Sequence, residues 1–215
     1  MEPFSLGGRG PQGSGKGVLI AFEGIDGCGK STQVGLLAAH LERRGISTLV
    51  TREPGGTRVG QEIRRVLLNP DLPTVPLAEL LLYLADRAQH VEEVILPALE
   101  EGMVVLTDRF SLSTLAYQCY GRELPRTLFF EVSRWILKGL KPDLTLVLDI
   151  PAEDVQKRIG TGKDRMERED GGFFSRVREG FLCEANKDDS IVVVDASQPV
   201  EEVHRMVVEL VESIL

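Results

Sequence analysis

The sequence has 215 residues and a formal net charge of -8, with 42% hydrophobic and 27% charged residues. This length and balance fit one α/β domain with a sizeable core and are unlike those of a disordered chain. An acidic chain repels polyanions, so we expect no nucleic-acid partner, and a small anionic substrate would need arginines concentrated at its site.

Short apolar runs alternate with segments of helical periodicity along the first half of the chain. The patterns predict strands at 18–23 and 47–51, and helices at 30–44, 57–68 and 77–101, the last with a kink or junction at Pro97. Residues 69–73, Asn-Pro-Asp-Leu-Pro, can only form a loop.

The second half continues the alternation. We predict strands at 103–108, 143–149 and 191–195, and helices at 113–120, 124–138 and 200–214. The pattern predicts an α/β fold with a five-stranded parallel sheet flanked by helices on both faces. Ligands in such folds bind at the carboxyl ends of the strands.

Two segments stand apart from this pattern. Residues 1–17 are rich in Gly, Pro and Ser and lack the apolar stretch of a secretory signal, so we expect a flexible tail before a single domain at 18–215. Residues 158–172 carry many charges, four glycines and almost no apolar residues. Because such a stretch cannot bury a face, we expect a short, mobile, basic lid.

The cysteines and the apolar runs bear on location. The chain has three cysteines, Cys28, Cys119 and Cys183. Their odd number and wide spacing argue against a disulfide framework or a zinc site, and apolar runs such as 144–148 are too short to span a bilayer. We expect a cytoplasmic protein with no membrane partner.

The strongest motif follows the first predicted strand and opens the first predicted helix. Residues 24–31 read Gly-Ile-Asp-Gly-Cys-Gly-Lys-Ser and match the phosphate-loop pattern G-x-x-x-x-G-K-[ST]. Backbone N–H groups and the helix dipole would hold the phosphates of a nucleoside triphosphate, Lys30 would reach the β and γ phosphates, and Ser31 would ligate Mg²⁺. The predicted nucleotide-binding residues are Gly24, Ile25, Asp26, Gly27, Cys28, Gly29, Lys30, Ser31 and Thr32.

Two other segments imitate nucleotide-binding motifs. Residues 10–16 have phosphate-loop spacing, but Gly17 replaces the hydroxyl residue and no strand precedes them. Residues 186–189, Asn-Lys-Asp-Asp, imitate the guanine-reading motif of GTPases but precede the last strand instead of following one. We interpret the latter as a polar loop at a helix end.

Three arginines fall where the acceptor of the phosphate should bind. Arg52 ends the second strand, Arg87 lies on the long helix in Tyr-Leu-Ala-Asp-Arg, and Arg109 closes the third strand in Asp-Arg-Phe. Each alone could simply pair with a neighbouring carboxylate. Together, at strand ends and beside the phosphate loop, they predict one anion-binding pocket.

The motifs at 23–32, 52–57 and 108–110, in this order, resemble the thymidylate kinase family, and the resemblance extends from Val18 to Leu215. The family implies a P-loop kinase fold, a homodimer, and transfer of the γ-phosphate of ATP to dTMP with Mg²⁺. It also implies several site residues. Tyr83 resembles the aromatic that stacks on thymine, and Arg87 the donor to a thymine carbonyl.

The resemblance extends to the phosphate and the sugar. Thr114 occupies the place of a side chain that reads the base edge, and Tyr117 that of one lying against the sugar. Arg109 resembles the clamp on the acceptor phosphate. Asp26 resembles a carboxylate near the sugar 3′-hydroxyl, and Glu53 one near the magnesium and acceptor site. We count Arg52 with this substrate-binding set.

Three positions depart from the family pattern, namely Cys28, Phe110 and Met166. Some thymidylate kinases place an arginine inside the phosphate loop, where this chain has neutral Gly27 and Cys28. A basic lid could supply the missing transition-state charge. We expect Arg165 or Lys163 to carry most of it, with Arg158 next, although a solvated charge run is the alternative.

Phosphoryl transfer to a phosphate oxygen needs positioning and charge neutralisation, and no general base. Accordingly, the three histidines lie in predicted helices away from the phosphate loop, and we expect them at the surface or in packing. Two other functions remain open. One is a kinase for a different nucleoside monophosphate or a deoxynucleoside, and the other is a P-loop regulator or GTPase.

Overall fold

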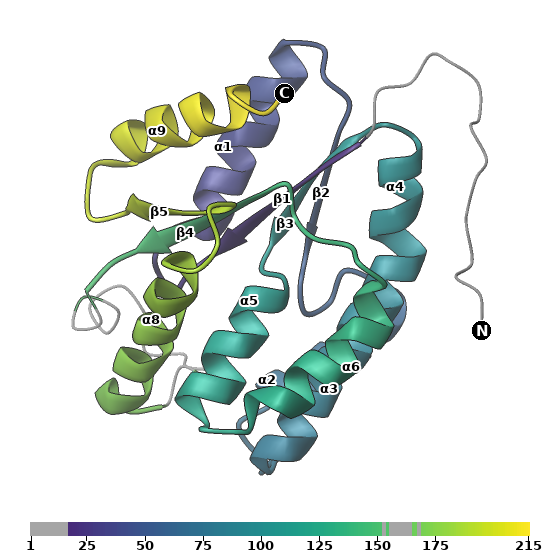
Figure 1. Ribbon diagram of the computed structural model, residues 1–215, viewed down its shortest axis with the longest axis vertical. Coiled ribbons are helices and arrows are strands. Elements are labelled where there is room, and N and C mark those ends of the chain that lie inside the picture. The colour runs from purple at the N-terminus through teal and green to yellow at the C-terminus, as the bar shows by residue number, and fades with distance from the viewer. Residues whose placement is uncertain (1–16, 152–153, 155–164, 167–168) are drawn as a thin grey trace.

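The computed structural model describes residues 17–151, 154, 165–166 and 169–215. Its five strands are parallel and form one sheet in the order β2-β3-β1-β4-β5, which confirms the predicted α/β architecture (Figure 1). The strands are β1 (Val18–Glu23), β2 (Thr48–Arg52), β3 (Val104–Asp108), β4 (Leu144–Asp149) and β5 (Ile191–Asp195). The strand before the phosphate loop therefore lies at the centre of the sheet.

Helices connect the strands and cover the sheet. They are α1 (Lys30–Arg43), α2 (Arg58–Leu68), α3 (Pro76–His90), α4 (Leu96–Glu100), α5 (Ser111–Thr114), α6 (Arg126–Leu137), α8 (Gly171–Ala185) and α9 (Val200–Glu212), with π-helical segments η1 (Val91–Ile95) and η2 (Leu115–Gly121). No helix in these described ranges is long and apolar enough to cross a membrane.

Both faces of the sheet are buried. Ile20 and Phe22 of β1 belong to an apolar cluster that includes residues of α1 and α9, which lie side by side in Figure 1. Leu19 and Ala21, the alternate residues, belong to a second cluster with residues of η1 and α4. The central strand thus has the continuous apolar sequence typical of a parallel sheet covered on both sides.

The structure corrects several predicted boundaries. The long helix predicted at 77–101 contains the π-helical segment η1, and Pro97 follows that segment at the start of α4, which agrees with the predicted junction. Gly171 and Gly172, assigned to the lid, are the first residues of α8, whose N-cap Asp170 accepts a hydrogen bond from Phe173 N. The sequence analysis had not delimited this helix.

Gly17, assigned to the tail, is buried where an added Cβ would lie 2.6 Å from the backbone of Leu99. The rest of the predicted tail and most of the predicted lid lie outside the described residues. This includes Arg158 and Lys163.

Candidate active site

The phosphate loop lies at the carboxyl end of β1 and leads directly into α1. Gly24 has a φ of 131°, and an added Cβ would lie 2.5 Å from the carbonyl oxygen of Leu148 in β4. Gly29, the N-cap of α1, has a φ of 100°. Only glycine suits such positions without strain, and the predicted succession of strand, loop and helix is confirmed.

Lys30 and Cys28 are buried within the loop. Lys30 Nζ donates to the carbonyl oxygens of Gly24 and Ile25 at 3.1 and 2.9 Å and lies 3.6 Å from Cys28 Sγ. The ammonium group therefore lies among carbonyl groups of the loop. Cys28 is only 2% exposed and fits as a small packed residue.

Ser31 donates from its hydroxyl to Asp108 Oδ2 at 2.5 Å. The pair joins the first turn of α1 to the end of β3. A hydroxyl and a carboxylate oxygen are the donors that Mg²⁺ prefers, and a phosphate-loop Ser with a strand-end Asp is the arrangement found in P-loop enzymes. The sequence analysis had assigned Ser31 to the metal but had given Asp108 no such role.

An open cleft of about 760 Å³ extends from the phosphate loop toward β2. Gly27, Lys30, Ser31 and Thr32 line it, together with exposed Arg52 at the end of β2. Arg52 lies level with Asp108 in the sheet, because parallel strands place their carboxyl ends together.

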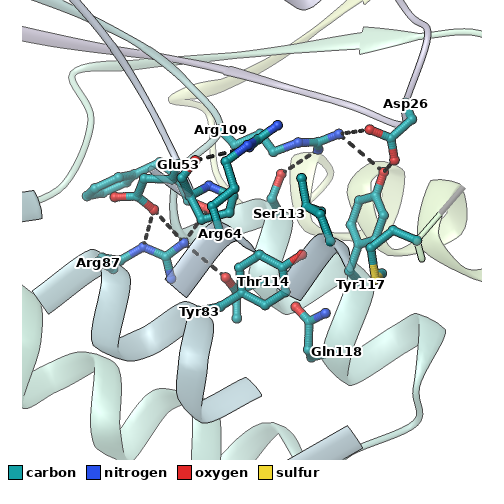
Figure 2. Close-up of a pocket in the computed structure, with 14 residues that line it drawn as sticks. Asp26, Glu53, Arg64, Tyr83, Arg87, Arg109, Ser113, Thr114, Tyr117 and Gln118 are labelled. Atoms are coloured by element: carbon teal, nitrogen blue, oxygen red, sulfur yellow. Dashed lines mark hydrogen bonds and ion pairs between the residues drawn. The ribbon is translucent and has the colours of Figure 1, made fainter. Parts of the chain in front are cut away.

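Arg109 joins the phosphate loop to the neighbouring pocket. Its Nη1 donates to Gly24 O at 2.9 Å. Nη1 also donates to Ser113 Oγ at 2.9 Å, and Nη2 donates to Asp26 Oδ1 at 2.5 Å (Figure 2). The guanidinium also lies over the ring of Tyr117, 5.1 Å from its centroid. Arg109 has a φ of 74°, an uncommon conformation for a bulky residue that recurs at functional sites.

Asp26 is held ionised by this arrangement. It accepts a hydrogen bond from the Tyr117 hydroxyl at 2.7 Å in addition to the one from Arg109. Burial alone would raise the pKa of Asp26, but the charges of Arg109 and Lys30 outweigh it, and the pKa lies below its ordinary value. The predicted sugar-side and phosphate-side residues thus form one connected group.

Arg87 and Glu53 form a buried ion pair at the base of the same pocket. Arg87 Nε donates to Glu53 Oε2 at 2.8 Å, and Nη2 donates to Phe110 O and Thr114 Oγ1 at 2.8 and 2.9 Å. The other oxygen of Glu53 contacts His90 Nδ1 at 2.9 Å. His90 is fully buried, as the prediction of a packing role allowed.

The free and occupied polar atoms of this ion pair indicate which of them could contact a ligand or a metal. Arg87 Nη1 is buried and has no hydrogen-bond partner among the described residues. An unpaired buried donor is costly, which makes this atom a candidate for a further hydrogen-bond partner. Both oxygens of Glu53, by contrast, already have protein partners, which favours a role in positioning Arg87 over direct metal ligation.

The narrow acceptor pocket is lined by residues of α2, α3, α5 and η2. Its lining includes Tyr83, Arg87, Arg109, Thr114 and Tyr117, which are five of the predicted substrate-binding residues. Asp26, Glu53, Arg64 and Arg109 line both this pocket and the open cleft. The structure thus brings the predicted donor and acceptor residues together, with Arg109 between them.

The sequence analysis missed several lining residues. Arg64 lies on α2, and Gln118 lies in η2 and donates to Glu79 Oε1 at 2.8 Å. Phe110, a departure from the family pattern, is fully buried beneath Arg87, with the guanidinium 5.5 Å from its ring centroid. Met166, another departure, is buried in the pocket wall. The only local signal for these residues was their proximity to named motifs.

Arg165 is paired with helix α3. Its Nη1 donates to Glu79 Oε2 at 2.6 Å, and its Nε donates to Leu67 O at 2.9 Å. Glu79 is fully buried and also receives Arg122. The predicted catalytic role of Arg165 stays a prediction, and its observed partners place it at the acceptor side.

The imitation of the guanine-reading motif has a structural explanation. Asp188 Oδ1 accepts from Ser190 N at 3.0 Å, which closes a turn before β5, and Lys187 pairs with Glu184. These contacts confirm a polar loop after α8. The three cysteines are free, as predicted.

A phosphate loop on the central strand and an arginine-lined pocket beside it define a P-loop nucleotide kinase. The family model "Thymidylate kinase" matches residues 22–207. A thymidylate kinase of Carboxydothermus hydrogenoformans is 50% identical over 190 residues, covering 87% of this chain and 93% of the relative. One of Neisseria gonorrhoeae is 44% identical over 197 residues, covering 90% and 96%.

A solved structure agrees with these matches. The crystal structure of thymidylate kinase from Ehrlichia chaffeensis superposes with a TM-score of 0.76 at 31% identity, covering 92% of this chain and all of that one. The chain belongs to the thymidylate kinase family of nucleoside monophosphate kinases.

Proposed function

We propose that this protein transfers the γ-phosphate of ATP to dTMP, forming dTDP and ADP. One observation carries the proposal: Arg109 lies at the junction of the open cleft and the narrow pocket and lines both. A phosphoryl group passing from a donor in one to an acceptor in the other must cross beside this guanidinium. Arginine suits that place because its planar fork binds phosphate oxygens in pairs.

The donor half would use the phosphate loop. Backbone N–H groups of the loop and the N-terminus of α1 would hold the triphosphate, and Lys30 would turn from the Gly24 and Ile25 carbonyls toward the phosphates. Ser31 and Asp108 would hold Mg²⁺. A bound Mg²⁺ would supply neutralisation of the phosphate charge at this place.

The acceptor half would use the narrow pocket. Arg87 Nη1, buried without a partner among the described residues, would donate to a thymine carbonyl. Tyr83 and Thr114 line the walls where the base would stack and present its edge. Tyr117 and Asp26, linked at 2.7 Å, would face the sugar.

The chemistry would need no general base, because the dTMP phosphate oxygen is already a nucleophile. Arg109 would orient that phosphate against the γ-phosphate, and ionised Asp26 would fix the guanidinium. Lys163 and Arg158 remain our candidates for the transition-state cation. Arg165 could join them only by leaving Glu79.

A coupled ADP-release assay tests the proposal directly. It would compare dTMP, dUMP, dCMP, dGMP and thymidine as acceptors. We expect the highest kcat/KM with dTMP, and thymidine should be a poor acceptor because it lacks the phosphate that Arg109 would bind. A preference for any other acceptor, or GTP binding without phosphorylation of an acceptor, would refute it.

We also propose a cytoplasmic homodimer. Leu77 and Leu81 on α3, and Phe130 and Trp135 on α6, are exposed, and Trp135 is 83% exposed. The two helices pack beside each other (Figure 1). Free cysteines suit a reducing compartment. Light scattering should give twice the chain mass for the wild type and a shift toward monomer for Leu81→Glu. A monomeric wild type would refute the dimer.

A further inference from the structure

The last residue of β1, Glu23, is a fully buried carboxylate that the proposed chemistry leaves unused. It lies directly before Gly24, the first residue of the phosphate loop. Burying a carboxylate is costly unless its oxygens are satisfied by donors. Its partners all come from the turn that follows β3, some ninety residues away along the chain.

Within the described ranges of the chain, both oxygens of Glu23 accept hydrogen bonds from donors. Oε1 accepts from the backbone N–H groups of Phe110 and Ser113 at 2.9 and 3.1 Å, and Oε2 accepts from the Ser113 hydroxyl. The Ser113 hydroxyl in turn accepts from Arg109 Nη1 at 2.9 Å. A hydroxyl has one proton, so it can accept from Arg109 in this way while donating to Glu23.

These contacts form two consecutive hydrogen bonds, in which Arg109 donates to Ser113 and Ser113 donates to Glu23. At the same time, the two backbone bonds hold the residues that follow Arg109, whose left-handed φ of 74° needs support from its surroundings. We propose that Glu23 is the positioning residue for Arg109, and that it acts through Ser113 and the backbone turn without touching either substrate. This inference rests on the proposed role of Arg109 as the clamp on the acceptor phosphate.

The direction of these hydrogen bonds, from Arg109 to Ser113 and from Ser113 to Glu23, makes a sharp test possible. Glutamine has nearly the shape of glutamate but only one acceptor oxygen. Turned toward the backbone, its amide nitrogen would face the two N–H donors of Phe110 and Ser113. Turned toward the Ser113 hydroxyl, it would donate to that oxygen, and the hydroxyl would lose the carboxylate to which it now donates. Glu23→Gln should therefore disturb Arg109 although it removes no volume.

The test is steady-state kinetics of Glu23→Gln, Ser113→Ala and the double variant. We expect each single variant to raise the KM for dTMP about tenfold, since a charge-assisted hydrogen bond contributes roughly this much, and to change the KM for ATP less than twofold. The KM of the double variant for dTMP should be no higher than that of the worse single variant, because both substitutions interrupt the same pair of hydrogen bonds. Ser133→Ala, which removes a buried serine hydroxyl on α6, is the matched control and should leave the kinetics unchanged.

A pH series adds a readout that a merely structural role would not move. Burial raises the pKa of Glu23 to about 7, against the opposing influence of Ser113 and Arg109. Arg109 is the cation that faces Glu23, and it is shared with Asp26, Asp108 and Tyr117, while β4 places apolar Val147 level with Glu23. Protonated Glu23, like glutamine, carries no charge and brings a donor toward the same partners. The KM ratio of variant to wild type should therefore shrink from pH 8 to pH 6.

A crystal structure of Glu23→Gln separates this inference from the proposed function. We expect the contact between Arg109 Nη1 and Ser113 Oγ to be longer than its 2.9 Å in the wild type, because the hydroxyl no longer donates to a carboxylate, whichever acceptor the enzyme uses. An intact contact together with a dTMP KM within twofold of wild type would overturn the inference. Failure of the acceptor assay with dTMP would instead overturn the proposed function.

Discussion

The two halves of the site are built differently. The acceptor pocket is narrow, and its charged side chains are already paired with one another, as in Arg87 with Glu53 and Arg109 with Asp26. The donor cleft is open, and its key cation, Lys30, makes hydrogen bonds to atoms of the phosphate loop itself. The difference indicates that the fold organises the acceptor side, and we propose that the triphosphate and its metal complete the donor side.

Arg109 lines both halves of the site, so we expect its substitution to have the largest effect on activity. We expect Arg109→Ala to lower kcat/KM for dTMP about 10³-fold, because the substitution removes a preorganised donor at the point of charge development. Arg109→Lys should recover little of this, since an ammonium cannot make the paired contacts. Steady-state kinetics measures the effect, and near-normal activity in Arg109→Lys would contradict a bidentate clamp.

Arg87 tests whether the acceptor side is held by the fold itself. Arg87→Met would leave Glu53 buried with only His90 as a partner, and removing one member of a buried pair costs about 3–5 kcal/mol of stability. Urea unfolding without ligands measures it. A loss below about 1 kcal/mol would show that the pair does not organise the pocket.

Glu23 belongs to the acceptor side through its link to Arg109, and the pH dependence of the free energy of unfolding tests how the fold holds it. Its folded pKa of about 7 lies above the ordinary 4.5, so the folded state binds more protons and wild-type stability falls as pH rises from 4.5 toward 7. Glu23→Gln does not titrate. Its free energy of unfolding relative to wild type should therefore rise by up to about 3 kcal/mol over that range. A difference that is flat with pH would mean that Glu23 keeps an ordinary pKa.

Ser31 should show the smallest effect, confined to the donor side. We expect Ser31→Ala to raise the Mg²⁺ concentration needed for half-maximal activity by about tenfold, because one oxygen of the ion's site is lost. Binding of dTMP to the nucleotide-free protein should not change. Weaker dTMP binding in this variant would show that the halves are not built separately.

Local patterns were enough to predict the sheet, the phosphate loop and most helices. The apolar run of β1 followed by glycines and a helix is a signal contained within fourteen residues. The π-helical segments η1 and η2 were not predictable, because the extra residue in a helical turn reflects packing against other elements.

The candidate site was predictable only where a motif carried it. Arg87 and Arg109 were found from their places along the chain and from the resemblance, but the pairs they form were not, since Glu53 lies 34 residues from Arg87 and Asp26 lies 83 residues from Arg109. Such pairs depend on how the strands are ordered in the sheet. Lys30 and Glu79 show the same limit, because nothing in the sequence indicated that one would contact loop carbonyls and the other would be fully buried.

Calorimetric titration of dTMP into the nucleotide-free protein tests the central claim most directly. If the fold organises the acceptor pocket, dTMP should bind one-to-one without ATP or Mg²⁺, and Arg109→Ala should abolish the signal. Binding that appears only after an ATP analogue and Mg²⁺ are added would contradict the claim, because the acceptor side would then need the donor side to assemble it.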